Sequence, residues 1–248
     1  IEMDLYPETR DLVVRGSYTL KNKTAATIDS IHIDHGNLKT DFSFDRGFER
    51  VLEDSVFNYD IFTVYPPIEP GDSIRFEFEL SNAPNEWLRN NSPVLGNGTF
   101  LNNSILPRIG YNPAGELIGS ESREKFDLAP KDRMPDATDS LARMNNYVSY
   151  DADWIDFETI ISTDSDQIAI APGYLEREWL DNGRRYFHYK MDSPILNFYS
   201  FISAEFSTAQ DYWLRTNGDT VTIEIYHHPA HDYNVERMIK GIKKALDY

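Results

Sequence analysis

The chain has 248 residues, 24 of them basic and 41 acidic, which gives a formal net charge of −17, and it contains no Cys. Such an acidic surface disfavours binding to nucleic acid and to anionic lipid headgroups, and the lack of Cys excludes disulfides and thiolate chemistry. Hydrophobic residues make up 40% of the chain, enough for a packed core, but no apolar run approaches the roughly 20 residues of a membrane-spanning helix.

The first half of the sequence is predicted to form β-strands. Apolar residues alternate with polar ones, as in Ile74, Phe76 and Phe78, a pattern typical of strands with one buried face. Pro70-Gly71 fits a turn whose glycine has a positive φ, and residues 21–24 suit a hairpin connection. The predicted strands are Asp11–Leu20, Thr27–Asp34, Ser55–Val64 and Ser73–Leu80.

The segment Gly110–Tyr150 is rich in Asp, Arg, Pro and Gly and has few β-branched residues. It is predicted to be a loop, with a short helical turn within Ile118–Met134. Strands then resume, with turns expected at residues 163–166, 181–183 and 217–219. These strands are Trp154–Ser162, Gln167–Ile170, Arg185–Met191, Phe198–Phe206 and Thr220–Tyr226.

The end of the chain, Asn234–Asp247, is predicted to be a helix with Asn234 as its N-cap. Its apolar residues recur at three- and four-residue spacing and form one stripe, which consists of Val235, Met238, Ile239, Ile242 and Leu246. The polar run Ser207–Leu214 indicates a boundary. We therefore predict a mainly β fold: an antiparallel, saddle-like β-sandwich over residues 1–206, followed by a linker, a short strand and a helix over residues 207–248.

Two groups of residues are candidates for a metal site. His227, His228 and His231 form the densest cluster of possible ligands, but adjacent side chains at a strand end point to opposite faces, which favours a connector over a zinc site. The acidic group permits a calcium site or paired carboxylates, although its spacing favours the exposed face of an edge strand. Its members are Asp151, Asp153, Asp156 and Glu158.

Aromatic residues are concentrated in the last third of the β-rich part. They permit a groove for sugar or peptide, but the core of a sandwich is the favoured use. The cluster comprises Phe187, Tyr189, Phe198, Tyr199 and Phe201.

Four blocks, in order, resemble the N-terminal β-sandwich of M1-type (gluzincin) zinc aminopeptidases. The fourth block, Pro-Ile-Leu-Asn-Phe-Tyr-Ser-Phe-Ile-Ser-Ala-Glu-Phe, is similar to the apolar strand that closes this sandwich in the family. The third, Gln-Ile-Ala-Ile-Ala-Pro-Gly-Tyr-Leu, is similar to a strand end of the same domain. The blocks are Leu12–Thr24, Ile68–Ile74, Gln167–Leu175 and Pro194–Phe206.

In that family a catalytic domain with a His-Glu-x-x-His zinc motif follows the sandwich. None of the six histidines here precedes a glutamate, so the resemblance implies a chain that is not an enzyme by itself and has no cofactor of its own. Zinc is expected only in a downstream catalytic domain of the same protein, of which Thr220–Tyr248 would be the first strand and helix. That domain and a peptide substrate are the expected partners.

The segment Asn97–Tyr111 resembles one bacterial subset, in which an M1-like unit is fused to an ABC-2-permease-like membrane region. The first residue is Ile1, so a signal or anchor segment is also expected to precede it. An extracytoplasmic location is implied, with membrane contact only through the longer protein.

In ordinary members of the family, a Gln or Glu shortly before the first conserved proline binds the free amino group of the substrate. Counting back from Pro107 leads to Asn97 and Gly98, which lack that acid. The resemblance therefore implies either a weakened substrate-binding role for Asn97, with Asn102 and Asn103 as further amide oxygens, or a changed recognition of the substrate. The alternative is that Asn97-Gly98 makes a tight turn with a positive φ and nothing more.

Two other functions stay open. One is an extracytoplasmic interaction module that binds a protein or a glycan, with no peptidase activity in the longer protein. The other, less favoured, is a free-standing metallohydrolase that uses His227, His228 and His231. A His-Glu-x-x-His motif beyond Tyr248 would favour the aminopeptidase hypothesis.

Overall fold

The computed structural model describes residues 1–84, 92–131, 134–140, 142–144 and 151–248. The predicted mainly β fold with a C-terminal helix is confirmed. The strands are β1 (Glu2–Tyr6), β2 (Asp11–Lys21), β3 (Ile28–Asp34), β4 (Lys39–Phe44), β5 (Gly47–Asp54), β6 (Tyr59–Ile68), β7 (Ser73–Asn82), β8 (Thr99–Asn102), β9 (Arg108–Ile109), β10 (Trp154–Ile155), β11 (Glu158–Asp164), β12 (Ile168–Ile170), β13 (Tyr174–Asp181), β14 (Arg184–Lys190), β15 (Ile195–Leu196), β16 (Ser200–Ala204), β17 (Ser207–Leu214) and β18 (Thr220–His227). The helices are α1 (Ser120–Glu124) and α2 (Val235–Leu246), with single 3-10 turns η2 (Asn103–Ile105), η3 (Pro113–Gly115) and η4 (Ala142–Met144).

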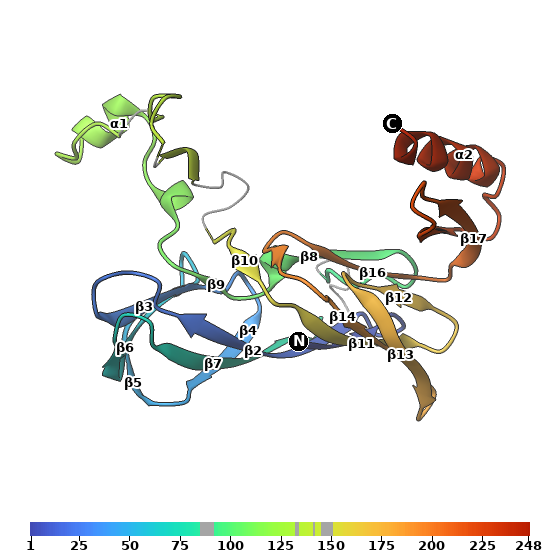
Figure 1. Cartoon of the computed structure of the whole chain (residues 1–248). Coiled ribbons are helices and arrows are strands. Elements are labelled where there is room, and N and C mark those ends of the chain that lie inside the picture. The colour runs from blue at the N-terminus through green and yellow to red at the C-terminus, as the bar shows by residue number, and fades with distance from the viewer. Residues whose placement is uncertain (85–91, 132–133, 141, 145–150) are drawn as a thin grey trace.

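The largest sheet has seven strands in the order β13-β14-β11-β1-β2-β7-β4 (Figure 1). A four-stranded sheet, β5-β6-β3-β9, and a three-stranded sheet, β12-β16-β8, accompany it. Two further pairs are β10–β15 and β17–β18. The strand pairs of the described residues are antiparallel except β1 and β11, which run parallel.

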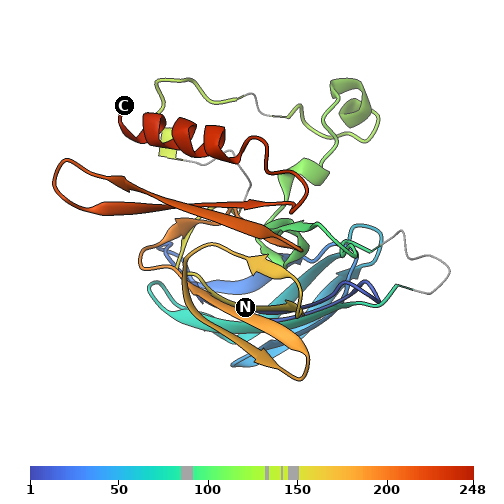
Figure 2. The same ribbon diagram turned by 90° about the vertical axis from the view of Figure 1, so that its right-hand side faces the viewer.

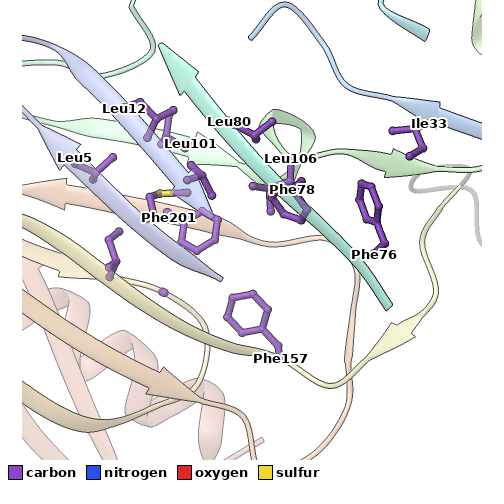
Figure 3. Close-up of a cluster of buried hydrophobic side chains, with 14 of the residues drawn as sticks. Leu5, Leu12, Ile33, Phe76, Phe78, Leu80, Leu101, Leu106, Phe157 and Phe201 are labelled. Atoms are coloured by element: carbon purple, nitrogen blue, oxygen red, sulfur yellow. The ribbon is translucent and has the colours of Figure 1, made fainter. Parts of the chain in front are cut away.

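The core lies between the seven-stranded sheet on one side and the four-stranded and three-stranded sheets on the other (Figure 3). The alternation in β7 places Phe76 and Leu80 inward, as predicted. The four-stranded sheet contributes Ile33, and the three-stranded sheet contributes Phe201 to the same cluster. Because each strand turns every second residue inward, the opposite face of the large sheet stays polar.

The connection between β2 and β3 corrects one prediction. Residues 21–24 do not form a hairpin, because β2 pairs with β7 while β3 pairs with β6 in another sheet. The chain crosses between sheets at the buried Asn22, whose Nδ2 donates to the carbonyls of Ala26 and Ile68, each at 2.8 Å. The Asn22 oxygen accepts the backbone N–H of Thr24 at 2.9 Å. A fully bonded buried amide thus fixes the crossing.

The strand predicted over Ser55–Val64 begins later, at Tyr59. Asp54 Oδ1 accepts the N–H groups of Val56 and Phe57 at 2.9 and 3.0 Å, and Asn58 has a φ of 53°. Residues 55–58 therefore form a turn whose backbone donors are satisfied by a side chain, not by a neighbouring strand.

Ser207–Leu214, predicted as a linker, is strand β17 and pairs with β18 along its whole length. The helix α2 is confirmed and lies against this hairpin, where Lys243 Nζ is 2.6 Å from Asp211 Oδ2 and Trp213 Nε1 donates to Asp247 Oδ1 at 2.7 Å. Asn234 occupies the N-cap position, but its side chain makes no capping hydrogen bond because its own backbone is already helical.

The predicted loop over Gly110–Tyr150 contains only α1 and the single turns η3 and η4 among its described residues, while residues 132–133, 141 and 145–150 lie outside the described chain. The loop and its short helical turn are thus confirmed where the structure describes them. No helix in the described ranges is both long enough and apolar enough to cross a membrane.

Candidate functional site

The Asn97 loop, residues 95–99, connects an irregular segment to β8. Gly98 has a φ of 87°, as a tight turn requires. Asn97 is exposed, and its Oδ1 accepts the backbone N–H of Glu205 at 3.0 Å. An amide oxygen has two lone pairs, so this bond orients Asn97 and leaves one acceptor position. The turn is present; a binding role for Asn97 stays a prediction.

A buried polar network, which sequence reasoning did not identify as functional, anchors this loop. Gln167 is 2% exposed, and its Nε2 donates to the carbonyl of Gly96 at 2.8 Å. Its Oε1 accepts the hydroxyl of Ser203 at 2.7 Å. Inside the loop, Thr99 Oγ1 accepts the N–H of Leu95 at 3.0 Å. The exposed tip is therefore held on a rigid base, as binding loops generally are.

The other two predicted amides lie at the far end of β8 from Asn97. Asn102 Oδ1 accepts the N–H of Ser104 at 3.0 Å and so caps η2. Asn103 Nδ2 donates to the carbonyl of Asn197 at 2.9 Å. The structure therefore does not gather the predicted binding amides around one point, and a shared role for them stays untested.

Two open hollows lie on the described surface. One, of about 470 Å³, is lined in part by His35, Pro93 and Ser104. The other, of about 480 Å³, lies along the seven-stranded sheet and includes Arg15 and Glu79. Asn97 lines neither of these two hollows.

The histidine cluster is organised by backbone contacts. His228 Nδ1 accepts the N–H of Ala230 at 3.2 Å, and His227 Nδ1 lies 3.0 Å from the carbonyl of His228. The rings of His228 and His231 have centroids 4.9 Å apart. Within the described part of the chain, no group of three or more His, Cys, Asp or Glu residues is placed to hold a metal ion.

Two members of the acidic group, Asp153 before β11 and Glu158 within it, form separate ion pairs. Asp153 lies 2.6 Å from Lys23 Nζ, and this hydrogen bond lowers the pKa of Asp153. Glu158 lies 2.7 Å from His188 Nε2, and the bonds from His188 and then Lys190 lower the pKa of Glu158. The predicted edge-strand face is wrong: Asp151, Asp153 and Asp156 lie outside the strands, and β11, which contains Glu158, is an inner strand of the seven-stranded sheet.

The aromatic cluster is mostly core, as favoured. Phe187, Tyr189 and Phe201 are buried and Tyr199 is half-buried, and burial strongly raises the pKa of both Tyr hydroxyls. Phe198 is the exception: it lies between the strands β15 and β16, and its side chain is exposed.

We expect the purified chain to bind no stoichiometric zinc. A stable site needs three or four ligands in tetrahedral geometry, and the described residues include no group of three or more possible ligands placed to hold a metal ion. Metal analysis after dialysis against a zinc buffer measures this. One tightly held zinc per chain, lost on replacing His228 and His231 with Ala, would contradict the prediction.

No protein-family model and no curated protein matches the sequence. Solved structures do match in fold. An M1 zinc metallopeptidase from Deinococcus radiodurans is 11% identical, with a TM-score of 0.55 over 93% of this chain and 47% of its own. Its E323A mutant, bound to a Tyr-Ser-Ala substrate, gives 13% identity and a TM-score of 0.53 over 90% of this chain and 45% of its own. Legionella pneumophila aminopeptidase A, in complex with aspartic acid, is 11% identical, with a TM-score of 0.55 over 92% of this chain and 23% of its own.

These identities establish a shared fold only. The chain spans less than half the length of these structural neighbours. It therefore has the fold of a part of M1 zinc peptidases, and the neighbours possess a further portion that this chain does not match.

Proposed function

We propose that this chain is the non-catalytic N-terminal domain of an M1-type metallo-aminopeptidase-like protein. The fold match over nine-tenths of this chain, against less than half of a zinc peptidase, carries the proposal. In the longer protein the sandwich would form a wall of the cleft, with the Asn97 loop facing the substrate and zinc held only by the downstream domain. Hydrolysis would then depend on that domain.

The C-terminal unit supports this proposal. The apolar stripe of α2 is only partly covered by the β17–β18 hairpin: Met238 is 50% exposed, Ile242 36% and Leu246 38%. An amphipathic helix with an open apolar side normally packs against a further element. We propose that residues 207–248 are the beginning of the catalytic-type domain, whose remaining elements cover this stripe.

The location and the parent protein are further proposals. The similarity of residues 97–111 to the permease-fused subset leads us to propose an extracytoplasmic domain that is tethered through the longer protein. The net charge of −17 supports this only in that it disfavours direct contact with anionic lipids.

A protein-binding module is the second candidate, because the turn between β5 and β6 exposes Val56 and Phe57.

A glycan-binding surface has less support. Trp179 and Tyr186 stack on one another with centroids 5.1 Å apart, and Arg177 covers the Trp179 ring at 4.8 Å. Sugar binding on this sheet would need one of these faces free.

The decisive experiment uses the protein extended beyond Tyr248. We expect it to bind one zinc and to release the N-terminal residue from peptides such as Tyr-Ser-Ala, while the chain 1–248 does neither. An extended protein without a zinc motif and without hydrolysis would favour the interaction module instead.

A separate prediction concerns Asn97 in the extended protein. Asn97→Glu is expected to strengthen binding of peptides with a free amine, because a carboxylate holds an ammonium better than an amide oxygen. Asn97→Ala is expected to weaken it by about 1 kcal/mol. Peptide titrations measure both, with N-acetylated peptide as the control. Unchanged affinity in both variants, together with lower stability, would show that the loop is only a turn.

A further inference from the structure

The segment from Tyr111 to Lys131, called here the Glu116 lobe, is organised around a carboxylate instead of an apolar core. Glu116 Oε1 accepts the hydroxyl of Tyr111 at 2.6 Å. Its Oε2 lies 3.3 Å from Arg123 Nη1 and 3.7 Å from Lys131 Nζ. These contacts draw both ends of the lobe to one side chain and lower the pKa of Glu116, with the Tyr111 hydrogen bond as the largest cause.

The same cations also bind the backbone of the lobe. Arg123 donates to the carbonyls of Ala129 at 2.6 Å and Leu117 at 2.9 Å. Lys131 Nζ donates to the carbonyl of Pro113 at 2.8 Å. Hydrogen bonds between charged donors and backbone acceptors are among the stronger ones. The fold of the lobe therefore depends on polar contacts at its centre.

The large apolar side chains of the lobe point outward. Leu117 is 41% exposed, Ile118 74%, Phe126 66% and Leu128 45%. Since polar contacts hold the lobe together, these side chains contribute little to its own folding. A group of apolar side chains exposed without such a role is typical of a contact surface.

The base of the lobe is fixed to the four-stranded sheet. Asp34, which is buried in β3, accepts Asn112 Nδ2 at 2.9 Å and Arg108 Nη2 at 2.5 Å. Gly110 donates its N–H to the carbonyl of His32 at 2.8 Å. The exposed side chains are thus presented from a defined position on the sandwich.

The lobe and α2 stand on the same side of the sandwich in both views (Figures 1 and 2). We infer that the apolar face of the Glu116 lobe is a second contact surface for the domain downstream of α2. This inference rests on the proposed function and names a contact that the fold match does not supply. The downstream domain would then lie between two surfaces, the stripe of α2 and the lobe.

Charge and chain length favour this occupant. The lobe has four acidic and three basic residues, so it lacks the basic cluster that an anionic membrane surface would attract. The structural neighbours extend to more than twice the matched length, which is enough for a further domain.

Hydrogen exchange, measured by mass spectrometry on the chain 1–248 and on the extended protein, tests the inference. We expect peptides of the lobe to exchange at least roughly tenfold more slowly in the extended protein. The double variant Ile118→Ser/Phe126→Ser should restore the rate of the chain 1–248. The matched control is Val56→Ser/Phe57→Ser, which alters side chains that are 82% and 67% exposed and should leave the slowed rate unchanged.

The variant is interpretable because the lobe depends on Glu116. In the chain 1–248 the double variant should therefore exchange like the unaltered chain, and faster exchange there would overturn the outward role of the two side chains. If α2 is protected in the extended protein while the lobe is not, the inference fails and the proposed function stands. If neither is protected, both fail. Protection that depends on the concentration of the chain 1–248 alone would show self-association and overturn the inference.

Discussion

Replacing Gly173 with Ala is expected to destabilise the chain by about 4 kcal/mol. Gly173 has a φ of 109°, a conformation that side chains rarely adopt. A Cβ atom there would lie 2.6 Å from the carbonyl carbon of Lys190 and 2.7 Å from its oxygen. Lys190 is paired with both β11 and β13, so its backbone cannot move away without breaking the ladder.

Gly183 provides the matched control. It has a φ of 79°, in the turn between β13 and β14, but nothing lies within 4 Å of an added Cβ. Gly183→Ala should therefore cost only the conformational strain, about 1 kcal/mol. Urea unfolding of both variants gives the two free energies. Equal losses would mean that close backbone contact does not determine the requirement for glycine at position 173.

The strands that could be predicted from the sequence are those with one buried face. The alternation of β7 located it to within two residues at its end, because Ile74 and Leu80 face the core and their neighbours face water. The strands β5 and β13 were not predicted, because neither has a buried face that would make apolar and polar residues alternate. Both lie at sheet edges, and nearly every side chain of each is exposed. Their sequences therefore lack the alternation of apolar and polar residues by which a strand is predicted.

Contacts between distant segments set the other limit. Lys21–Thr24 has the composition of a hairpin turn, yet Asn22 bonds to Ile68 and thereby joins two sheets. In the candidate site, the Asn97-Gly98 dipeptide correctly indicated a tight turn. Its partner Glu205 is 108 residues away in the sequence, and local spacing contains no information about such a contact.

The resemblance to a family predicted which segments form the sandwich, which composition alone does not indicate. Its four blocks fall on or beside strands that the structure confirms, β2, β7, β12 and β16. It also placed the candidate loop. It gave no indication of the polar network beneath that loop. Nothing in the sequence distinguishes Gln167, which directly precedes β12, from an exposed Gln at the start of a strand.

Replacing Gln167 with Leu is expected to destabilise the chain by about 3 kcal/mol. The apolar side chain fits the volume of the amide but removes the acceptor of the buried Ser203 and Thr163 hydroxyls, which keep only their bond to one another, and the donor to the carbonyl of Gly96. Burying a polar group without its hydrogen bond costs far more than the bond itself contributes. The loss should also free the Asn97 loop from its base.

Two measurements separate these effects. Urea unfolding gives the change in stability, and hydrogen exchange of residues 95–99 under native conditions reports on the loop, where faster exchange is expected in Gln167→Leu. Gln210→Leu is the control, because Gln210 is exposed on β17 and its amide donates to the exposed Glu224. This substitution should change the free energy of unfolding by less than about 0.5 kcal/mol. Lower stability with unchanged exchange in the loop would mean that Gln167 stabilises the sandwich without positioning Asn97. A loop that exchanges faster while the Glu205 N–H stays protected would show that the bond between Asn97 and Glu205 persists without the contact from Gln167.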